Sequence, residues 1–151
     1  MGRVVATNKK AYFNFFIEET FEAGIELQGS EVKSIRNGNI SLNESYAIIK
    51  NGEAFLLNAH IAPYEKGSHY NPDPKRTRRL LLHKREILKI QSKIQEKGYT
   101  LVATKVYFKQ ALVKVELGIA KGKQLYDKRR AIQEKEQKRT VDRMIKEQKY
   151  R

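Results

Sequence analysis

The chain has 151 residues, the length of one ordinary domain, and its 31 lysine and arginine side chains outnumber 17 acidic ones, giving a formal net charge of +14. The absence of cysteine excludes disulfides, thiolate metal sites and a cysteine nucleophile, and it fits a reducing compartment. No apolar segment has the length of a signal peptide or a membrane span, so we expect a cytoplasmic protein. The positive charge favours a polyanionic partner such as nucleic acid, and an acidic membrane surface is the alternative.

Aromatic and β-branched residues dominate the N-terminal part of the chain. The segment AYFNFFIEETFEAGIEL, residues 11–27, predicts two strands that reverse direction at its polar break, Glu18-Glu19-Thr20. A helix of at most two turns is predicted next, with Ser30 as its N-cap. Gly38 supplies the left-handed residue that commonly ends such a helix.

The clearest local signal in the sequence is a β-hairpin. Two apolar runs, YAIIK and EAFLLN, are separated by Asn51-Gly52, the pair that best supplies positive φ angles in a two-residue turn. The segment between Ala62 and Arg79 then contains all three prolines and the basic run KRTRR. This composition predicts an extended, exposed loop.

A helix and two strands complete the predicted core. Ile87, Ile90 and Ile94 recur at helical spacing among polar residues, and Gly98 ends the pattern. The segments YTLVATKVYF and ALVKVELG alternate apolar and polar residues as two strands that join near Lys109-Gln110.

The order of these elements favours a mainly β fold, because several short strands occur without regular strand–helix alternation. We expect residues 1–122 to form a small β-barrel of the oligonucleotide-binding (OB) type with two or three helices, since closure removes the exposed edges of a small sheet. The same pattern also permits an open α+β sandwich.

The C-terminal segment differs in composition from the predicted barrel. Residues 121–151 carry twelve basic and five acidic side chains, which is +7 of the total charge. Because few sizeable apolar residues follow Tyr126, we expect the basic tail, residues 123–151, to be disordered when free. A thin apolar line through Val141, Met144 and Ile145 predicts that the tail becomes helical on contact with RNA, and a solubilising tail without a fixed role is the alternative.

Groups that could converge on a catalytic or metal site are scarce. The three histidines lack metal-ligand spacing, and the chain has neither a phosphate-cradling glycine loop nor a nucleophile-elbow serine. Glu18 and Glu22 share one face of a predicted strand and could pair as acids, but solvated strand charges are the more common explanation. We therefore expect no enzyme activity, no catalytic residue, no metal and no cofactor.

Cations of the predicted loop and short helix are candidates for RNA contacts. Each guanidinium group can direct two donors at phosphate oxygens, which predicts phosphate contacts for Arg76, Arg78 and Arg79. Lys33 and Arg36 lie one helical turn apart and could flank the same RNA surface, with a solvated helix face as the alternative. Three aromatic residues are candidates for stacking on unpaired bases: Tyr12, Phe13 and Tyr70.

Three longer blocks carry a resemblance to a known family: FIEETFEAGIELQGSEVKSIRNGNISLNESYAIIKNGEAFLLNAHIAPYE, NPDPKRTRRLLLHKREI and GIAKGKQLYDKR. From about Asn8 to Met144 the chain resembles small protein B (SmpB), a family of bacterial proteins that bind transfer-messenger RNA (tmRNA, SsrA) in trans-translation. The resemblance implies an OB-type barrel and a non-enzymatic RNA-binding role. Composition and periodicity alone indicate only a basic barrel with a basic tail.

The resemblance also implies site residues in two groups. Glu22 would accept hydrogen bonds from nucleotide edges while it lies between cations. The implied RNA-binding residues on the barrel and at the start of the tail are Glu22, Lys33, Arg36, Leu81, His83, Lys114, Lys121 and Lys123. In the tail, the ribosome-contacting residues are expected to be Tyr126, Asp127, Lys128, Arg129, Lys135, Lys138, Arg139, Met144 and Ile145, with Tyr126 stacking on a base.

The partners implied by the resemblance are the tRNA-like domain of tmRNA and a stalled ribosome. Family membership would imply that the protein promotes aminoacylation of tmRNA and reaches the ribosome with elongation factor Tu, which it meets indirectly through tmRNA. The tail would occupy the vacant decoding centre of the small subunit and the mRNA channel. We expect a monomer with no membrane partner, and the alternative is a generic RNA-binding or ribosome-associated OB-fold module.

Overall fold

The computed structural model describes residues 2–64, 71–123 and 132–133. Within these residues the main sheet is antiparallel and contains seven strands. Their order is β1 (Val4–Thr7), β8 (Tyr99–Lys109), β9 (Leu112–Gly122), β2 (Phe15–Ile25), β7 (Arg78–Leu81), β5 (Glu53–Leu57) and β4 (Tyr46–Lys50). The short strands β3 (Ile40–Ser41) and β6 (His60–Ile61) pair separately.

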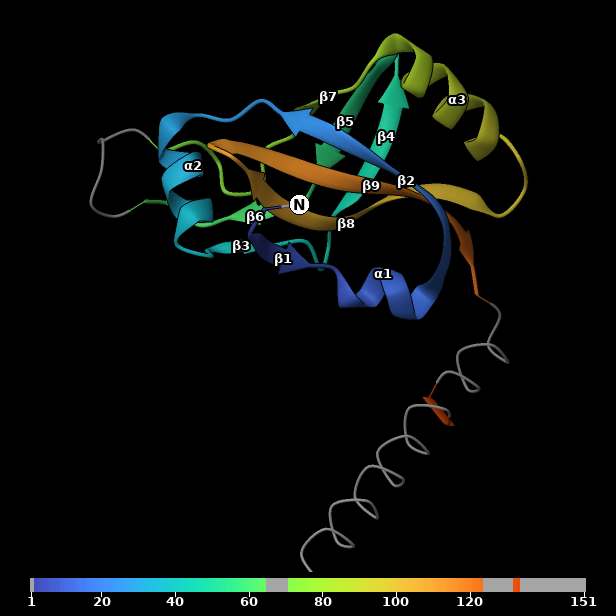
Figure 1. Cartoon of the computed structure of the whole chain (residues 1–151), viewed down its shortest axis with the longest axis horizontal. Coiled ribbons are helices and arrows are strands. Elements are labelled where there is room, and N and C mark those ends of the chain that lie inside the picture. The colour runs from blue at the N-terminus through green and yellow to red at the C-terminus, as the bar shows by residue number, and fades with distance from the viewer. Residues whose placement is uncertain (1, 65–70, 124–131, 134–151) are drawn as a thin grey trace, which may run out of the picture.

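The main sheet curls until its edge strand β4 lies against β8. The prediction of a mainly β fold with an OB-type barrel is thereby confirmed. Figure 1 shows α1 (Lys9–Asn14), α2 (Gly29–Arg36) and α3 (Lys84–Ile94) outside the sheet at three separate places. The barrel interior is filled mainly by aliphatic side chains, among them Ile35, Leu42, Leu56, Leu80, Ile90, Leu101, Val106, Val115, Leu117 and Ile119.

The N-terminal aromatic segment folds differently from its prediction. Residues 11–14 belong to α1, and β2 continues without reversal through the expected turn at Glu18-Glu19-Thr20. The strand passes this polar stretch because it pairs with β9 along nearly its whole length, and a bulge after Ile17 absorbs the irregularity. The helix begins at Asn8, whose side chain accepts a hydrogen bond from the Ala11 amide at 3.1 Å and donates one to the Ala103 carbonyl at 3.0 Å.

The other predicted elements are confirmed with small shifts. The β4–β5 hairpin turns at Asn51 and Gly52, whose φ angles are 53° and 76°. The strands β8 and β9 join through Gln110, at φ 57°. The N-cap of α2 is Gln28, not Ser30, because the Glu31 side chain accepts a hydrogen bond from the Gln28 amide at 2.9 Å.

A cluster of one buried carboxylate, one buried guanidinium group and one partly exposed guanidinium group connects α2 to β7. We call it the Glu31 cluster. The Arg78 Nε atom lies 2.7 Å from Glu31 Oε2, and the Arg76 Nη2 atom lies 2.6 Å from Glu31 Oε1. Arg78 also donates to the carbonyls of Ala59 at 2.8 Å and Pro74 at 3.0 Å. The cluster therefore holds the helix, the strand and the chain before the strand together.

The Glu31 cluster corrects one predicted RNA contact. The Arg78 side chain is 0% exposed, so it cannot contact a phosphate, and its role is structural. Burial alone would raise the pKa of Glu31, but hydrogen bonds from Arg76, the Gln28 amide and Arg78 outweigh burial and lower that pKa. Glu31 is therefore ionised at neutral pH.

We predict that Glu31→Gln lowers the free energy of unfolding by about 3 kcal/mol, because it leaves Arg78 as a buried cation without its countercharge. Urea unfolding followed by circular dichroism measures this loss. The matched control is Glu44→Gln, which removes an exposed ion pair with Lys10 at 2.8 Å and should leave stability nearly unchanged. Equal effects of the two substitutions would contradict a structural role for the Glu31 cluster.

Candidate RNA-binding surface

A row of paired residues crosses four strands on the outer face of the sheet. Tyr107 of β8 pairs with Lys114 of β9, Lys114 pairs with Gly24 of β2, and Gly24 pairs with Leu81 of β7. Glu22 lies on the same face of β2 as Gly24, since side chains alternate along a strand. We call these five residues the outer strip. It brings together three residues that the sequence predicted to bind RNA: Glu22, Leu81 and Lys114.

The carboxylate of Glu22 is held by two donors from β8. The Tyr107 hydroxyl donates to Glu22 Oε2 at 2.6 Å, and the Lys109 ammonium donates to Oε1 at 3.2 Å. The hydrogen bond from Tyr107 is the main cause of a lowered pKa of Glu22; burial opposes it, and Lys109 and Lys114 add to it. Burial, followed by the bond to Glu22, raises the pKa of Tyr107. Glu22 is therefore an ionised acceptor among cations at neutral pH.

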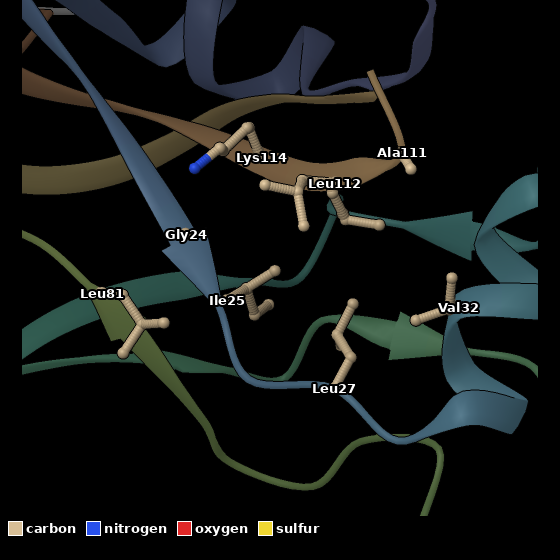
Figure 2. Close-up of a pocket in the computed structure, with 9 residues that line it drawn as sticks. Gly24, Ile25, Leu27, Val32, Leu81, Ala111, Leu112 and Lys114 are labelled. Atoms are coloured by element: carbon tan, nitrogen blue, oxygen red, sulfur yellow. The ribbon is translucent and has the colours of Figure 1, made fainter. Parts of the chain in front are cut away.

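An apolar pocket of about 250 Å³ adjoins the outer strip. Figure 2 shows side chains from β2, α2 and β9 converging on it, with Lys114 at its margin. Leu81 is 46% exposed and Leu112 is 60% exposed, so aliphatic surface is open to solvent beside the Lys114 cation. Such a surface offers apolar contact to the face of a base and a cation to a phosphate. The pocket is lined by Gly24, Ile25, Leu27, Val32, Leu81, Ala111, Leu112, Val113 and Lys114.

Two predicted cations belong to α2, the helix that contributes Val32 to this pocket. Val32 lines the pocket, and the exposed Lys33 follows it on the same helix. The Lys33 ammonium lies 5.4 Å from the centroid of the Tyr64 ring. Arg36 is exposed at the C-terminal end of α2, where its carbonyl accepts a hydrogen bond from the Arg3 side chain at 2.8 Å. Arg3 thus adds a cation that the sequence did not single out.

The remaining predicted residues, in β7 or beside β7 and α3, differ in accessibility. Arg76 keeps 27% of its side chain exposed, although Glu31 engages its guanidinium. Arg79 is 45% exposed and lies 3.3 Å from Glu26 and 3.2 Å from Glu53. Exposed ion pairs of this kind contribute little stability, so they hold the Arg79 guanidinium group only weakly. His83 is exposed at the start of α3, where it lines a second hollow with Phe21, Arg85, Glu86 and Lys89.

Lys121 and Lys123 lie at the opposite end of β9 from Lys114. The Lys123 amide donates to the Asn14 carbonyl at 2.9 Å, and its ammonium donates to the Tyr12 carbonyl at 3.1 Å. The Lys121 ammonium lies 5.8 Å from the Tyr99 ring centroid. Exposed aromatic side chains surround this second area: Tyr12 at 39%, Phe13 at 41% and Phe16 at 47%. The predicted residues therefore divide between the outer strip and this tail base, residues 121–123.

Other predictions lie outside the described residues. These are the stacking role of Tyr70, the disorder and induced helix of residues 124–131 and 134–151, and the tail contacts of Tyr126, Asp127, Lys128, Arg129, Lys135, Lys138, Arg139, Met144 and Ile145. Among the residues that the structure does describe, no group of three or more His, Asp or Glu side chains could hold a metal ion. No helix in that part of the chain is long and apolar enough to cross a membrane.

Besides Arg3, sequence reasoning missed three residues of this surface: Tyr107, Lys109 and Leu112. The alternation along β8 and β9 contained the signal, because it places Tyr107 and Lys109 on the face opposite the buried Val106 and Phe108. Aromatic residues in a strand are more often part of the core, and Tyr107 is indeed only 4% exposed. Its hydroxyl nevertheless reaches Glu22.

Comparisons with known proteins show similarity to one family along nearly the whole chain. The family described as "SmpB protein" matches residues 5–147. An SsrA-binding protein of Geobacillus kaustophilus is 55% identical over 146 residues, covering 97% of this chain and 94% of the relative. One from Acetivibrio thermocellus is 58% identical over 145 residues, covering 96% and 94%. A solved structure described as "tmRNA-SmpB: a journey to the center of the bacterial ribosome" contains a similar chain, with a TM-score of 0.69, 47% identity and coverage of 82% and 87%.

We predict that Lys114→Gln weakens RNA binding several-fold and lowers the slope of log affinity against log salt by about one, as the loss of one phosphate contact does. Lys50→Gln is the matched control, because Lys50 is an exposed lysine at the turn of the β4–β5 hairpin and is not part of the outer strip. Fluorescence anisotropy at several salt concentrations measures both values. The same loss for both variants would mean that the cations act only through net charge.

Proposed function

Because the chain belongs to the SmpB family, we propose that it binds tmRNA and acts with it at stalled ribosomes as a non-enzymatic factor of trans-translation. The relatives are SsrA-binding proteins, and a similar chain comes from a tmRNA–SmpB structure on the bacterial ribosome. The chain spans nearly the full length of those relatives. This full-length match is the observation that carries the proposal.

The outer strip supports a role in RNA binding. It combines a half-buried cation with an ionised acceptor in one row of residues, and an apolar pocket adjoins that row. The cation suits phosphates, the acceptor suits base edges and the apolar pocket suits base faces. We assign this area to the tRNA-like domain of tmRNA, with Lys33 and Arg36 of α2 and Arg79 of β7 as flanking cations.

The barrel, residues 1–122, and the basic tail, residues 123–151, have separate roles in the proposed function. The barrel holds the tRNA-like domain and promotes its aminoacylation, and the complex reaches the ribosome with elongation factor Tu bound to tmRNA. The tail, with most of the +7 of residues 121–151, enters the vacant decoding centre and the mRNA channel and becomes helical there. Tyr126 stacks on a base of that centre. The protein acts as a cytoplasmic monomer.

Competition between RNAs tests the proposed partner. Unlabelled tRNA-like domain should displace labelled tmRNA at physiological salt at far lower concentration than bulk RNA does, because nonspecific phosphate binding weakens as salt rises. Electrophoretic mobility shifts measure the displacement. Equal displacement by both competitors would favour a generic RNA-binding or ribosome-associated module, the alternative that the basic charge alone supports.

Deletion of all residues after Lys123 tests the division of labour. The truncated protein should keep its affinity for the tRNA-like domain within about twofold, because the outer strip is intact, and should lose tagging of stalled peptides. Filter binding and a reconstituted translation assay measure the two activities. Parallel loss of both would show that the tail and the barrel do not act separately.

A further inference from the structure

We infer that Tyr107 is a positioning residue for RNA binding, which fixes the Glu22 carboxylate in the orientation that accepts hydrogen bonds from nucleotide N–H groups. The inference rests on the proposed function and on the role of Glu22 within it. On this inference, a nearly buried tyrosine contributes to RNA recognition by holding the Glu22 carboxylate in place.

The geometry of the pair is unusual because the two residues belong to strands that are not neighbours. Strand β9 lies between β8 and β2, so the backbones that carry Tyr107 and Glu22 are about 10 Å apart. The tyrosine side chain crosses β9 beside its partner Lys114, and its hydroxyl reaches Glu22 Oε2 at 2.6 Å. A bond of this length to an ionised acceptor is a strong one.

The two donors to Glu22 differ in how firmly they hold it. Tyr107 has two side-chain torsions and is 4% exposed, so its ring is fixed by packing. The Lys109 side chain is flexible and 57% exposed, and its contact with Glu22 measures 3.2 Å. Tyr107 is therefore the fixed donor, and it leaves the remaining lone pairs of the carboxylate available to a ligand.

An acceptor that is already oriented loses less conformational entropy when RNA binds. The bond also keeps Glu22 ionised, and an ionised carboxylate is an acceptor only, which suits the N–H groups of a base edge. The titratable groups around Glu22 are Tyr107 and Lys109 of β8, Lys114 and Glu116 of β9, and His83, which follows β7.

We predict that Tyr107→Phe, which removes only the hydroxyl, weakens binding of the tRNA-like domain about tenfold at neutral pH. The same substitution made in a Glu22→Gln protein should change affinity by less than about twofold, because the group that Tyr107 positions no longer carries its charge. Anisotropy titrations of the full-length single and double variants complete this cycle. Additive effects would overturn the inference.

The pH profile provides a readout that a purely structural role would not move. Without the Tyr107 hydroxyl, the pKa of Glu22 should rise towards its ordinary value of 4.5. As the pH falls from 7, the variant should therefore lose affinity at a higher pH than the wild-type protein does. Because His83 and the lysines are present in both proteins, the difference between the two profiles reports on Glu22. Coincident profiles would contradict the inference.

Tyr99→Phe is the matched control. Tyr99 lies on the same strand, and its hydroxyl donates to Glu18 at 3.0 Å in a similar pair at the other end of β8. This variant should bind RNA like the wild-type protein, and thermal unfolding establishes that both variants are folded. A tenfold loss for Tyr99→Phe as well would assign the effect to the sheet in general.

Two further outcomes separate this inference from the proposed function. If the wild-type protein does not prefer tmRNA over bulk RNA, the proposed function fails at that step. If the wild-type protein does prefer tmRNA, the Glu22→Gln variant tests the inference. Equal or tighter binding by this variant would mean that Glu22 repels phosphate or makes no contact with RNA, and the inference alone would be wrong. Preferential tmRNA binding with coupled losses for Tyr107 and Glu22 supports both.

Discussion

The Glu31 cluster is the interaction on which the arrangement of the candidate RNA-binding surface depends. It joins α2 to β7, and both elements contribute walls to the apolar pocket, through Val32 and Leu81. Neither α2, with two turns, nor β7, with four residues, has enough surface of its own to fix its position. A buried carboxylate that requires both guanidinium groups supplies the missing constraint, because any displacement leaves charges without partners.

The surface that results is not uniformly basic. Most of the protein carries excess positive charge, which attracts RNA without regard to sequence or shape. Within the outer strip and its adjoining pocket, an ionised glutamate and exposed leucines interrupt this field. In the proposed function, the cations bring an RNA to the barrel, whereas the acceptor and the apolar pocket distinguish one RNA structure from another. Selectivity in such an interface depends on the few residues that are not cations.

Local sequence signals predicted the elements that short-range geometry determines. Asn51-Gly52 specified its hairpin, and the spacing of Ile87 and Ile90 specified α3, because turn chemistry and helical period act over a few residues. The helix α1 was missed because its aromatic residues favour strands, whereas the helix is stabilised by contacts distant in sequence, among them the hydrogen bond from Asn8 to the Ala103 carbonyl and packing against β8. Arg78 was wrongly assigned to RNA because its partner Glu31 lies 47 residues away in sequence. A local pattern could not reveal that pairing. The grouping of Glu22, Leu81 and Lys114 came from the family resemblance, and strand pairing provides its physical explanation.

The strand β9 also fixes the distance between Lys114 and Lys123. Lys114 lies near the start of this strand and Lys123 directly follows its end, so nine residues of extended chain separate them by about 30 Å. Because β2 and β8 flank β9 along most of this span, the distance is rigid. A mononucleotide or dinucleotide cannot reach from one end to the other. Simultaneous occupation of both ends therefore requires either one large, folded RNA or two separate RNA molecules, and the barrel acts as a spacer that holds them at a fixed separation.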